Sequence, residues 1–231
     1  SMALWFNLKF NKELDISMKG FHPNGHLIGQ IYKVGAPSIV VQAIGSLMTY
    51  GMNLILAAFG SAQTVFGIYF KLQSFVFMPV FGLNNGMVPI IAYNYGARHK
   101  DRVIRTIKHS VAYGVGIMCV GLIVMHIFPA QLMRMFDAEE SLIAIGVPAL
   151  ETISLSFVFA GFCIVVGSVF QALGNGVYSM IVSVARQMCV LLPVAKLLSL
   201  SGEVTLIWWA FPIAELASLL LSTYFLSLIH I

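Results

Sequence analysis

Four ionisable residues, Lys71, Glu151, Arg186 and Glu215, interrupt long apolar stretches of the sequence and are its most chemically informative side chains. A charge at membrane depth costs at least about 2.5 kcal/mol on insertion scales, so such residues are paired or functional. At the helical rise, Lys71 and Glu151 fall roughly 12 and 13 Å from the outer starts of their stretches. We predict that Lys71 meets Glu151 and that Arg186 meets Glu215. For the second pair, a neutralised packing contact is the simpler interpretation.

Prolines and glycines break up the stretch that contains Lys71. Prolines remove backbone donors, so this helix should kink near its middle. The predicted hinge residues are Pro79, Gly82, Gly86 and Pro89. Asn84 and Asn85 add polar groups at the same level. Two interpretations stay open: the glycines let helices pack closely while the asparagines bond across the contact, or this segment lines a water-filled cavity.

The other reactive residue types form no pattern of catalysis or metal binding. The sequence contains no GxSxG, HExxH or glycine-rich phosphate loop, and no histidine or cysteine pair has the spacing of metal ligands. Cys119, Cys163 and Cys189 fall inside apolar stretches and are interpreted as small buried residues. We therefore predict no catalytic residues, no metal site, no bound cofactor and no enzymatic activity.

Six apolar stretches must position these residues. Hydrophobic residues make up 59% of the chain and charged residues 10%, far from the roughly 25% charge of soluble domains. Each stretch reaches the roughly 20 residues that cross a bilayer as a helix, and none alternates as a barrel strand does. The second and fourth are long enough to require tilt or kinks. The predicted spans are about 35–59, 63–94, 106–128, 142–172, 177–199 and 204–229.

Basic residues predict the orientation of these spans. They gather before the first span and between the second and third, and both places lie on the same side of the membrane. By the positive-inside rule that side is cytoplasmic, as are both termini. The net charge of +4 is thereby explained by topology, and nucleic acid is not a predicted partner. The residues concerned are Lys9, Lys12, Lys19, Lys33, Arg98, Lys100, Arg102, Arg105 and Lys108.

Four motifs carry a family resemblance. The runs VGAPSI, KLQSFVFMPVFGLNNGMVPIIAYNYGARHKDRV, FQALGN and WWAFPIAE occur in this order and resemble the carboxy-terminal half of a multidrug and toxic compound extrusion transporter. The resemblance covers nearly the whole chain. It implies an all-α transmembrane six-helix bundle, one lobe of a twelve-helix, two-lobe transporter. Residues 1–34 would hold the end of the preceding helix and the cytoplasmic connector between lobes, residues 35–231 would form the lobe, and the amino-terminal lobe is absent from this chain.

The resemblance also implies a function. Such a lobe belongs to a secondary active antiporter that exports amphipathic, often cationic, compounds across the plasma membrane, here the bacterial inner membrane, in exchange for H⁺ or Na⁺. Sodium-coupled members can carry acidic residues on the helices that match spans one and four. Span one offers only Gln42 and Asn53, and span four offers Glu151, so the coupling ion stays open between H⁺ and Na⁺.

The expected cleft-lining residues lie on spans one and two, where aromatic and methionine side chains accept varied apolar shapes. Each has an alternative interpretation as a lipid-facing or helix-packing residue. They are Met48, Tyr50, Asn53, Gln73, Phe77, Met78, Phe81 and Asn84.

Two other functions remain as alternatives. One is a lipid-linked oligosaccharide flippase of the same superfamily, which would favour a more cationic cleft than Lys71 and Arg186 provide. The other is a stand-alone structural or accessory membrane protein. The expected partners are the lipid bilayer, small amphipathic substrates and the absent lobe, and the chain on its own is expected to self-associate.

Overall fold

The computed structural model describes residues 24–229, apart from the side chains at positions 30, 33 and 34. The chain divides into two compact units, residues 1–35 and 36–231. In the first unit, the described part is the beginning of helix α2. Of the predicted connector, residues 1–23 lie outside the described residues, as do residues 230 and 231, whereas residues 25–34 are helical and belong to α2. The architecture below is that of the second unit.

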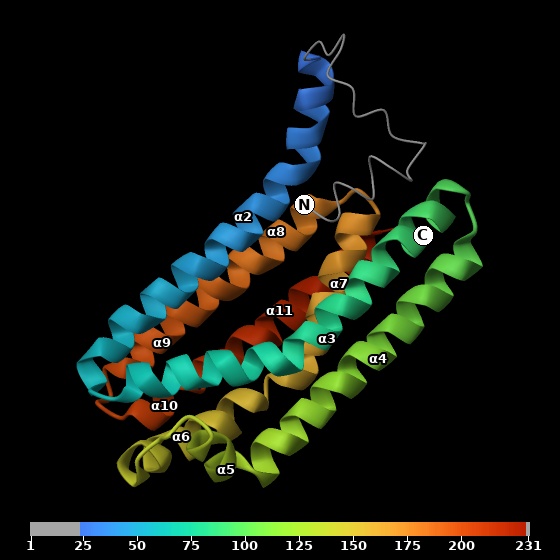
Figure 1. The fold of residues 1–231 in the computed structure, drawn as a ribbon. Helices are drawn as coiled ribbons and strands as arrows, with labels where there is room; N and C mark the ends of the chain where they lie inside the picture. The colour runs from blue at the N-terminus through green and yellow to red at the C-terminus, as the bar shows by residue number, and fades with distance from the viewer. Residues whose placement is uncertain (1–23, 230–231) are drawn as a thin grey trace, which may run out of the picture. The chain divides into compact units, whose positions relative to one another are not determined.

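Every regular element between residues 24 and 229 is helical, and most helices run roughly along one common direction (Figure 1). This confirms the predicted all-α fold. The elements in chain order are α2 (Gly25–Leu56), η1 (Ala57–Phe59), α3 (Ala62–Gly96), α4 (Lys100–Ile127), α5 (Pro129–Arg134), α6 (Glu140–Ser154), α7 (Phe157–Ala172), α8 (Gly176–Val184), the π-helical segment η2 (Ala185–Leu191), α9 (Leu192–Ser199), α10 (Val204–Ile207) and α11 (Ala210–Leu228).

By length and composition these helices provide five candidate membrane spans, or six if one bent helix pair counts as a single span. Five stretches are long and apolar enough to cross a membrane: Gly35–Phe59, Ala62–Gly96, Lys100–Ile127, Gly176–Ser199 and Val204–Leu228. The sixth candidate is the pair α6 and α7, which is bent by 49°. These segments match the six predicted spans closely.

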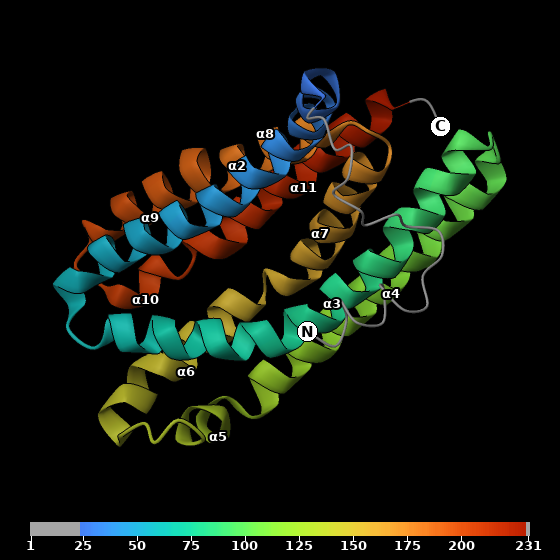
Figure 2. The same ribbon diagram turned by 45° about the horizontal axis from the view of Figure 1, so that its top comes forward.

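The two overlong spans accommodate their length differently. Helix α3 remains continuous through Pro79 and Pro89, yet it changes direction part-way along (Figures 1 and 2), as the prolines predict. The fourth span breaks between Ser154 and Phe157, and Pro148 lies inside the helical part of α6. At the break the Ser156 hydroxyl donates to the Ile153 carbonyl at 2.6 Å, and such local bonds compete with the helical ladder.

Small residues allow a close helix crossing between α4 and α7. A methyl group on Gly161 would lie 3.0 Å from the Met118 Cγ and 3.1 Å from the Gly114 carbonyl oxygen. Glycine at such a site lets two helix backbones approach. Methyl groups on Gly82 and Gly86 would meet no heavy atom within 4 Å. The interpretation of these two as packing glycines is therefore wrong within this lobe.

An aromatic cluster fastens the beginning of α3 to α10 and α11. The Phe66 ring centroid lies 6.5 Å from that of Trp208 and 6.1 Å from that of Phe211, and Tyr69 lies 5.9 Å from Phe211. Trp208 is completely buried. Large aromatic rings in offset or edge contact contribute strongly to packing, so this cluster joins the second and sixth spans.

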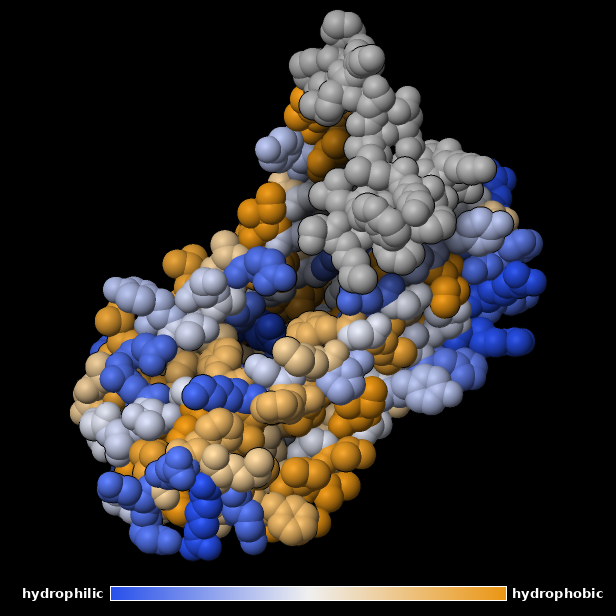
Figure 3. Space-filling view, in the orientation of Figure 1, coloured by the Kyte–Doolittle hydropathy of each residue, from blue (hydrophilic) through white to orange (hydrophobic). Residues whose placement is uncertain are grey.

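Helix α2 lies beside α8 and α9 from residue 36 onward (Figures 1 and 2). A methyl group on Gly51 would lie 2.8 Å from Leu192, and one on Gly176 would lie 3.5 Å from Pro37. The first span therefore packs on the fifth. Between α2 and α3 the molecular surface is hollowed, and hydrophilic side chains lie deep in this hollow (Figure 3).

Candidate functional site

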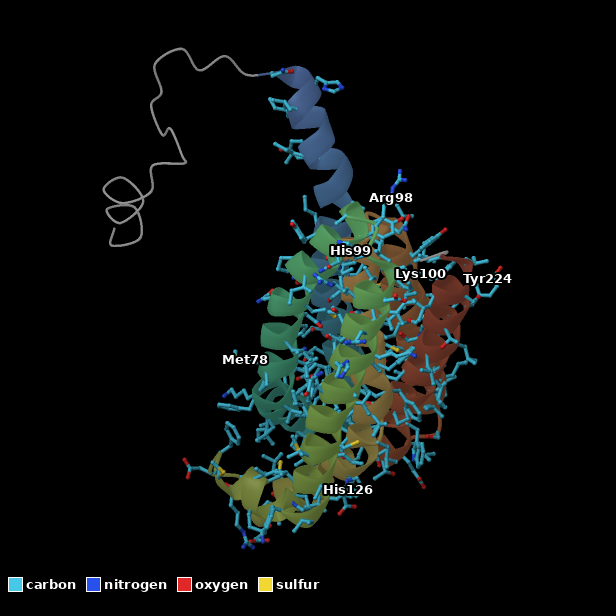
Figure 4. The ribbon with its side chains drawn as sticks, turned by 90° about the vertical axis from the view of Figure 1, so that its right-hand side faces the viewer. Met78, Arg98, His99, Lys100, His126 and Tyr224 are labelled. Atoms are coloured by element: carbon cyan, nitrogen blue, oxygen red, sulfur yellow. The ribbon has the colours of Figure 1, made fainter. Side chains whose placement is uncertain are left out.

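One face of α3 combines polar and apolar side chains at membrane depth. Its members recur every three or four residues, the spacing that places side chains on one side of a helix. Met78 is 67% exposed and Phe81 is 52% exposed, and Figure 4 shows Met78 on the outer side of α3. We call the exposed stripe the α3 face. It consists of Lys71, Ser74, Met78, Phe81, Asn85 and Pro89.

The predicted residues of α2 divide between surface and interior. Tyr50 is 65% exposed, whereas Met48 packs partly against the core. The Asn53 side-chain amide donates to the Thr49 carbonyl at 2.9 Å. The Asn53 carbonyl in turn accepts a bond of 2.8 Å from Gln63 at the start of α3. Tyr50 is thus the residue of this group that remains free to contact a ligand.

Three predicted lining residues of α3 point into the lobe instead. Gln73 is half-buried, and Phe77 packs edge-on against Phe157 with ring centroids 5.3 Å apart. Asn84 is buried and its amide donates to the Ile164 carbonyl of α7 at 3.4 Å. Asn84 therefore bonds across a helix contact and does not belong to the α3 face, while its neighbour Asn85 is exposed.

The predicted pairing of Arg186 with Glu215 is confirmed. The Arg186 Nη1 lies 2.5 Å from the Glu215 Oε1, with 26% and 11% of the two side chains exposed. Arg186 belongs to η2, the π-helical part of the fifth span, and Glu215 to α11. π-helical turns are frequent at functional sites. This one places the Arg186 guanidinium beside the Glu215 carboxylate, which lipid could not solvate.

A polar strip on α11 continues from this ion pair, and sequence reasoning missed it. Glu215, Ser218 and Ser222 are all buried, and the Glu215 Oε2 and both serine hydroxyls have no bonding partner among the described residues. Their spacing of three and four residues, which places them on one helix side, was the available signal. Gln187 of η2 is also buried and adds a polar group on the fifth span.

Lys71 and Glu151 do not form the predicted ion pair. Among residues 24–229 the ion pairs are Arg134–Glu140 and Arg186–Glu215. The Lys71 ammonium instead lies over the Phe136 ring, 5.5 Å from its centroid, a cation–π contact. Similar depth does not ensure contact, because it does not specify which way a helix turns its side chains.

The two ends of the lobe differ in their polar groups. Figure 4 shows Arg98, His99 and Lys100 together at one end and His126 at the other. The His126 Nδ1 lies 3.2 Å from the Ser154 hydroxyl at the break of the fourth span, a contact that the sequence did not indicate. Within residues 24–229 no group of three or more His, Cys, Asp or Glu side chains could hold a metal ion.

Comparison with known proteins now identifies the family. The MatE family model matches residues 37–197, the greater part of the chain. The chain belongs to the MatE family. Relatives named multidrug export protein MepA are 27% identical: the protein of Staphylococcus haemolyticus over 213 residues, with 92% of this chain and 46% of that protein covered, and that of Staphylococcus aureus over 218 residues, with 92% and 48% covered.

Solved structures agree with the MatE assignment. The MATE multidrug transporter DinF-BH has a TM-score of 0.85 and 31% identity, with 98% of this chain and 51% of that chain covered. A structure of MATE in the straight conformation shares the fold, with a TM-score of 0.88, 17% identity and coverage of 98% and 52%. This MatE chain thus spans about half the length of the relatives that it matches, as expected of one lobe in a two-lobe transporter.

Proposed function

We propose that this chain forms the carboxy-terminal lobe of a secondary active antiporter that exports amphipathic, often cationic, compounds. The observation that carries this proposal is the α3 face. Lys71 and Asn85 would be unsatisfied in hydrocarbon, whereas Met78 and Phe81 offer an adaptable apolar surface. Such a mixed surface suits the wall of a water-accessible cleft that receives amphipathic molecules. The relatives named as multidrug export proteins support the same function.

The opposite wall of this cleft would come from an amino-terminal lobe. Alternating access in transporters built from repeats requires one bundle to rock against another around a central site. Tyr50 of α2, which is 65% exposed, would extend the wall formed by the α3 face. We place the protein in a bacterial plasma membrane with the Arg98–Lys108 end in the cytoplasm, in agreement with the positive-inside rule.

Glu151 is the carboxylate that we assign to the coupling ion, H⁺ or Na⁺. The other carboxylate at membrane depth, Glu215, is engaged by Arg186. Glu151 is half-buried, precedes the break in the fourth span and has no ion-pair partner among residues 24–229. A carboxylate in this position could bind and release a cation as the two halves of the span move.

Efflux of a cationic dye tests the role of the α3 face. The protein expressed from its complete gene would carry Met78→Ala and Phe81→Ala together, and Leu220→Ala would be the control because Leu220 is an exposed apolar residue of α11. We expect dye efflux to fall at least about fivefold in the double variant, since each side chain contributes an apolar contact worth over about 1 kcal/mol. Unchanged efflux, at equal expression, would remove the α3 face from the proposal.

The same assay distinguishes the coupling ion and the need for a second lobe. Proteoliposomes with an imposed Na⁺ or H⁺ gradient should transport dye under one of the two gradients, and Glu151→Gln should abolish that dependence.

The 231-residue chain alone should not transport, because one bundle provides a single wall. Gradient-driven transport by this chain alone would favour a homodimeric transporter.

A further inference from the structure

An open groove runs between α3 and α4 on the half of the lobe nearest the turn that joins these helices at residues 97–99. Its volume is about 700 Å³, and it is lined by α3 from Gly82 to Asn94 and by α4 from Arg102 to Tyr113. This volume lies within the range of about 300 to 1,000 Å³ that small-molecule sites occupy. The groove lining shares no residue with the α3 face or with the Arg186–Glu215 pair.

The floor of the groove is apolar and unobstructed. Gly82 and Gly86 lie one helical turn apart, and a methyl group on either would meet no heavy atom within 4 Å. Met87 and Ile90 contribute further apolar surface. A floor of glycine backbone and aliphatic side chains offers a flexible hydrocarbon chain close contact along its length.

Basic side chains occupy the end of the groove nearest the turn. Arg102, Arg105 and His109 succeed one another at three and four residues along α4, so they share one helix side. At about 1.5 Å per residue they lie roughly 3, 7 and 13 Å from the start of the helix. Neither arginine has an acidic partner among residues 24–229.

Two further features favour an anionic, hydroxyl-bearing ligand at this end. The Asn94 amide donates to the Ile90 carbonyl, while its Oδ1 is buried without a donor among the described residues. Hydrophilic side chains gather over the neighbouring turn (Figure 3). Between positions 98 and 108 the sequence has five basic residues and one acidic residue.

We propose that this groove binds an anionic phospholipid of the cytoplasmic leaflet, with its phosphate on Arg102 and Arg105 and one acyl chain along Gly82 and Gly86. Guanidinium groups favour phosphate oxygens, and the cytoplasmic leaflet supplies anionic lipid to basic residues near a helix end. The choice of leaflet rests on the proposed orientation, while the binding itself does not.

Native mass spectrometry of the protein expressed from its complete gene tests the site. After delipidation, the protein would be incubated with phosphatidylglycerol or phosphatidylcholine of matched acyl chains. Arg105→Gln should lower the retained phosphatidylglycerol about fivefold, the effect of one basic residue at an anionic surface, and Arg105→Lys should restore much of it. Lys108→Gln, on the same helix but outside the groove lining, should leave retention unchanged.

Filling the groove provides an independent arm. Gly86→Leu should reduce retention, and Gly116→Leu is the matched control, because a methyl group there also meets nothing within 4 Å and Gly116 does not line the groove. Equal retention of the two lipids, equal losses in variant and control, or displacement by millimolar inorganic phosphate would overturn the proposal. The proposal would also be overturned if another part of the protein covered the groove. In that case a thiol reagent would label the cysteine of Gly116→Cys but not that of Gly86→Cys.

This measurement is independent of transport. Lipid retention in detergent requires neither dye efflux nor a membrane orientation, so loss of the lipid site would leave the antiporter proposal standing. A wrong antiporter proposal would likewise leave the lipid result intact.

Discussion

At the scale of single residues, the Arg186–Glu215 pair explains how two charges are held inside an apolar bundle. Each partner alone would leave an uncompensated charge, and breaking a buried pair costs about 3 to 5 kcal/mol, whereas replacing both partners with apolar residues is often nearly neutral. The bond of 2.5 Å places the two groups in direct contact. The pair is therefore expected to behave as a unit in mutagenesis.

Replacing both partners of the ion pair should restore much of the stability that is lost when one partner is replaced. In the protein from its complete gene, Arg186→Met or Glu215→Leu should each lower the free energy of unfolding by about 3 kcal/mol, the low end of the range because Arg186 is partly exposed. Arg186→Met with Glu215→Leu should cost clearly less than the sum, as coupled neighbours do. Thermal unfolding in detergent measures this cycle, and additive losses would show that the two charges act independently.

Lys71, in contrast to Arg186, does not form its predicted ion pair. Its ammonium contacts the Phe136 ring, so its partner within the described residues is an uncharged aromatic face and not Glu151. A cation–π contact contributes about 0.5 to 1 kcal/mol at an exposed site. This leaves Lys71 on the α3 face with its charge available, and leaves Glu151 without an ion-pair partner among residues 24–229.

At the scale of elements, the lobe depends on one close helix crossing and one broken span. Gly114 and Gly161 bring α4 and α7 together, and this contact supports the helix that follows the break at Ser154–Phe157. Beside it, α3 stays helical through Pro79 and Pro89 although each proline removes one backbone donor, and it bends without breaking (Figure 2). Rigid packing on one side and an interrupted span on the other are the elements that a rocking bundle needs.

Replacing glycine with alanine should distinguish the glycines that pack at the α4–α7 crossing from glycines that have space for a methyl group. Gly161→Ala would bring its methyl 3.1 Å from the Gly114 carbonyl oxygen and should destabilise the protein by about 1 to 3 kcal/mol, as overpacking does. Gly116→Ala, where a methyl group meets nothing within 4 Å, should be neutral or slightly stabilising because alanine favours helix. Thermal stability in detergent compares them, and equal effects would contradict the assigned crossing.

At the scale of the whole molecule, the polar ends of the lobe predict its orientation in the membrane. Arg98, His99 and Lys100 lie at one end, and His126 lies at the other (Figure 4). The far end also carries the exposed Arg134–Glu140 ion pair. Basic residues concentrated at one end predict that this end is cytoplasmic.

Cysteine accessibility on intact cells tests the topology. With the native cysteines removed, cysteine at Glu140 should react with a membrane-impermeant thiol reagent, and cysteine at Lys100 should react only after the cells are opened. Both positions are exposed in the lobe, so accessibility reports the side of the membrane. Labelling at Lys100 but not at Glu140 in intact cells would reverse the orientation.

Span number, helical class and the family resemblance were predictable from the sequence because they depend on properties that run along the chain. Hydrophobic length determines where a helix can cross a bilayer, and the ordered motifs point to a single family. The depth of a residue in the membrane also follows from its position along the helix. This is why the pairing of Arg186 with Glu215 could be predicted from the sequence.

Which side a helix turns toward its neighbours was decided only by the tertiary structure. Asn84 and Asn85 are adjacent in sequence, yet one bonds to α7 and the other is exposed, because successive helical residues point about 100° apart. Lys71 reached Phe136 and not Glu151 for the same reason. The rotation of each helix about its own axis depends on packing between segments that are distant in the sequence. The local spacing of residues does not specify this rotation.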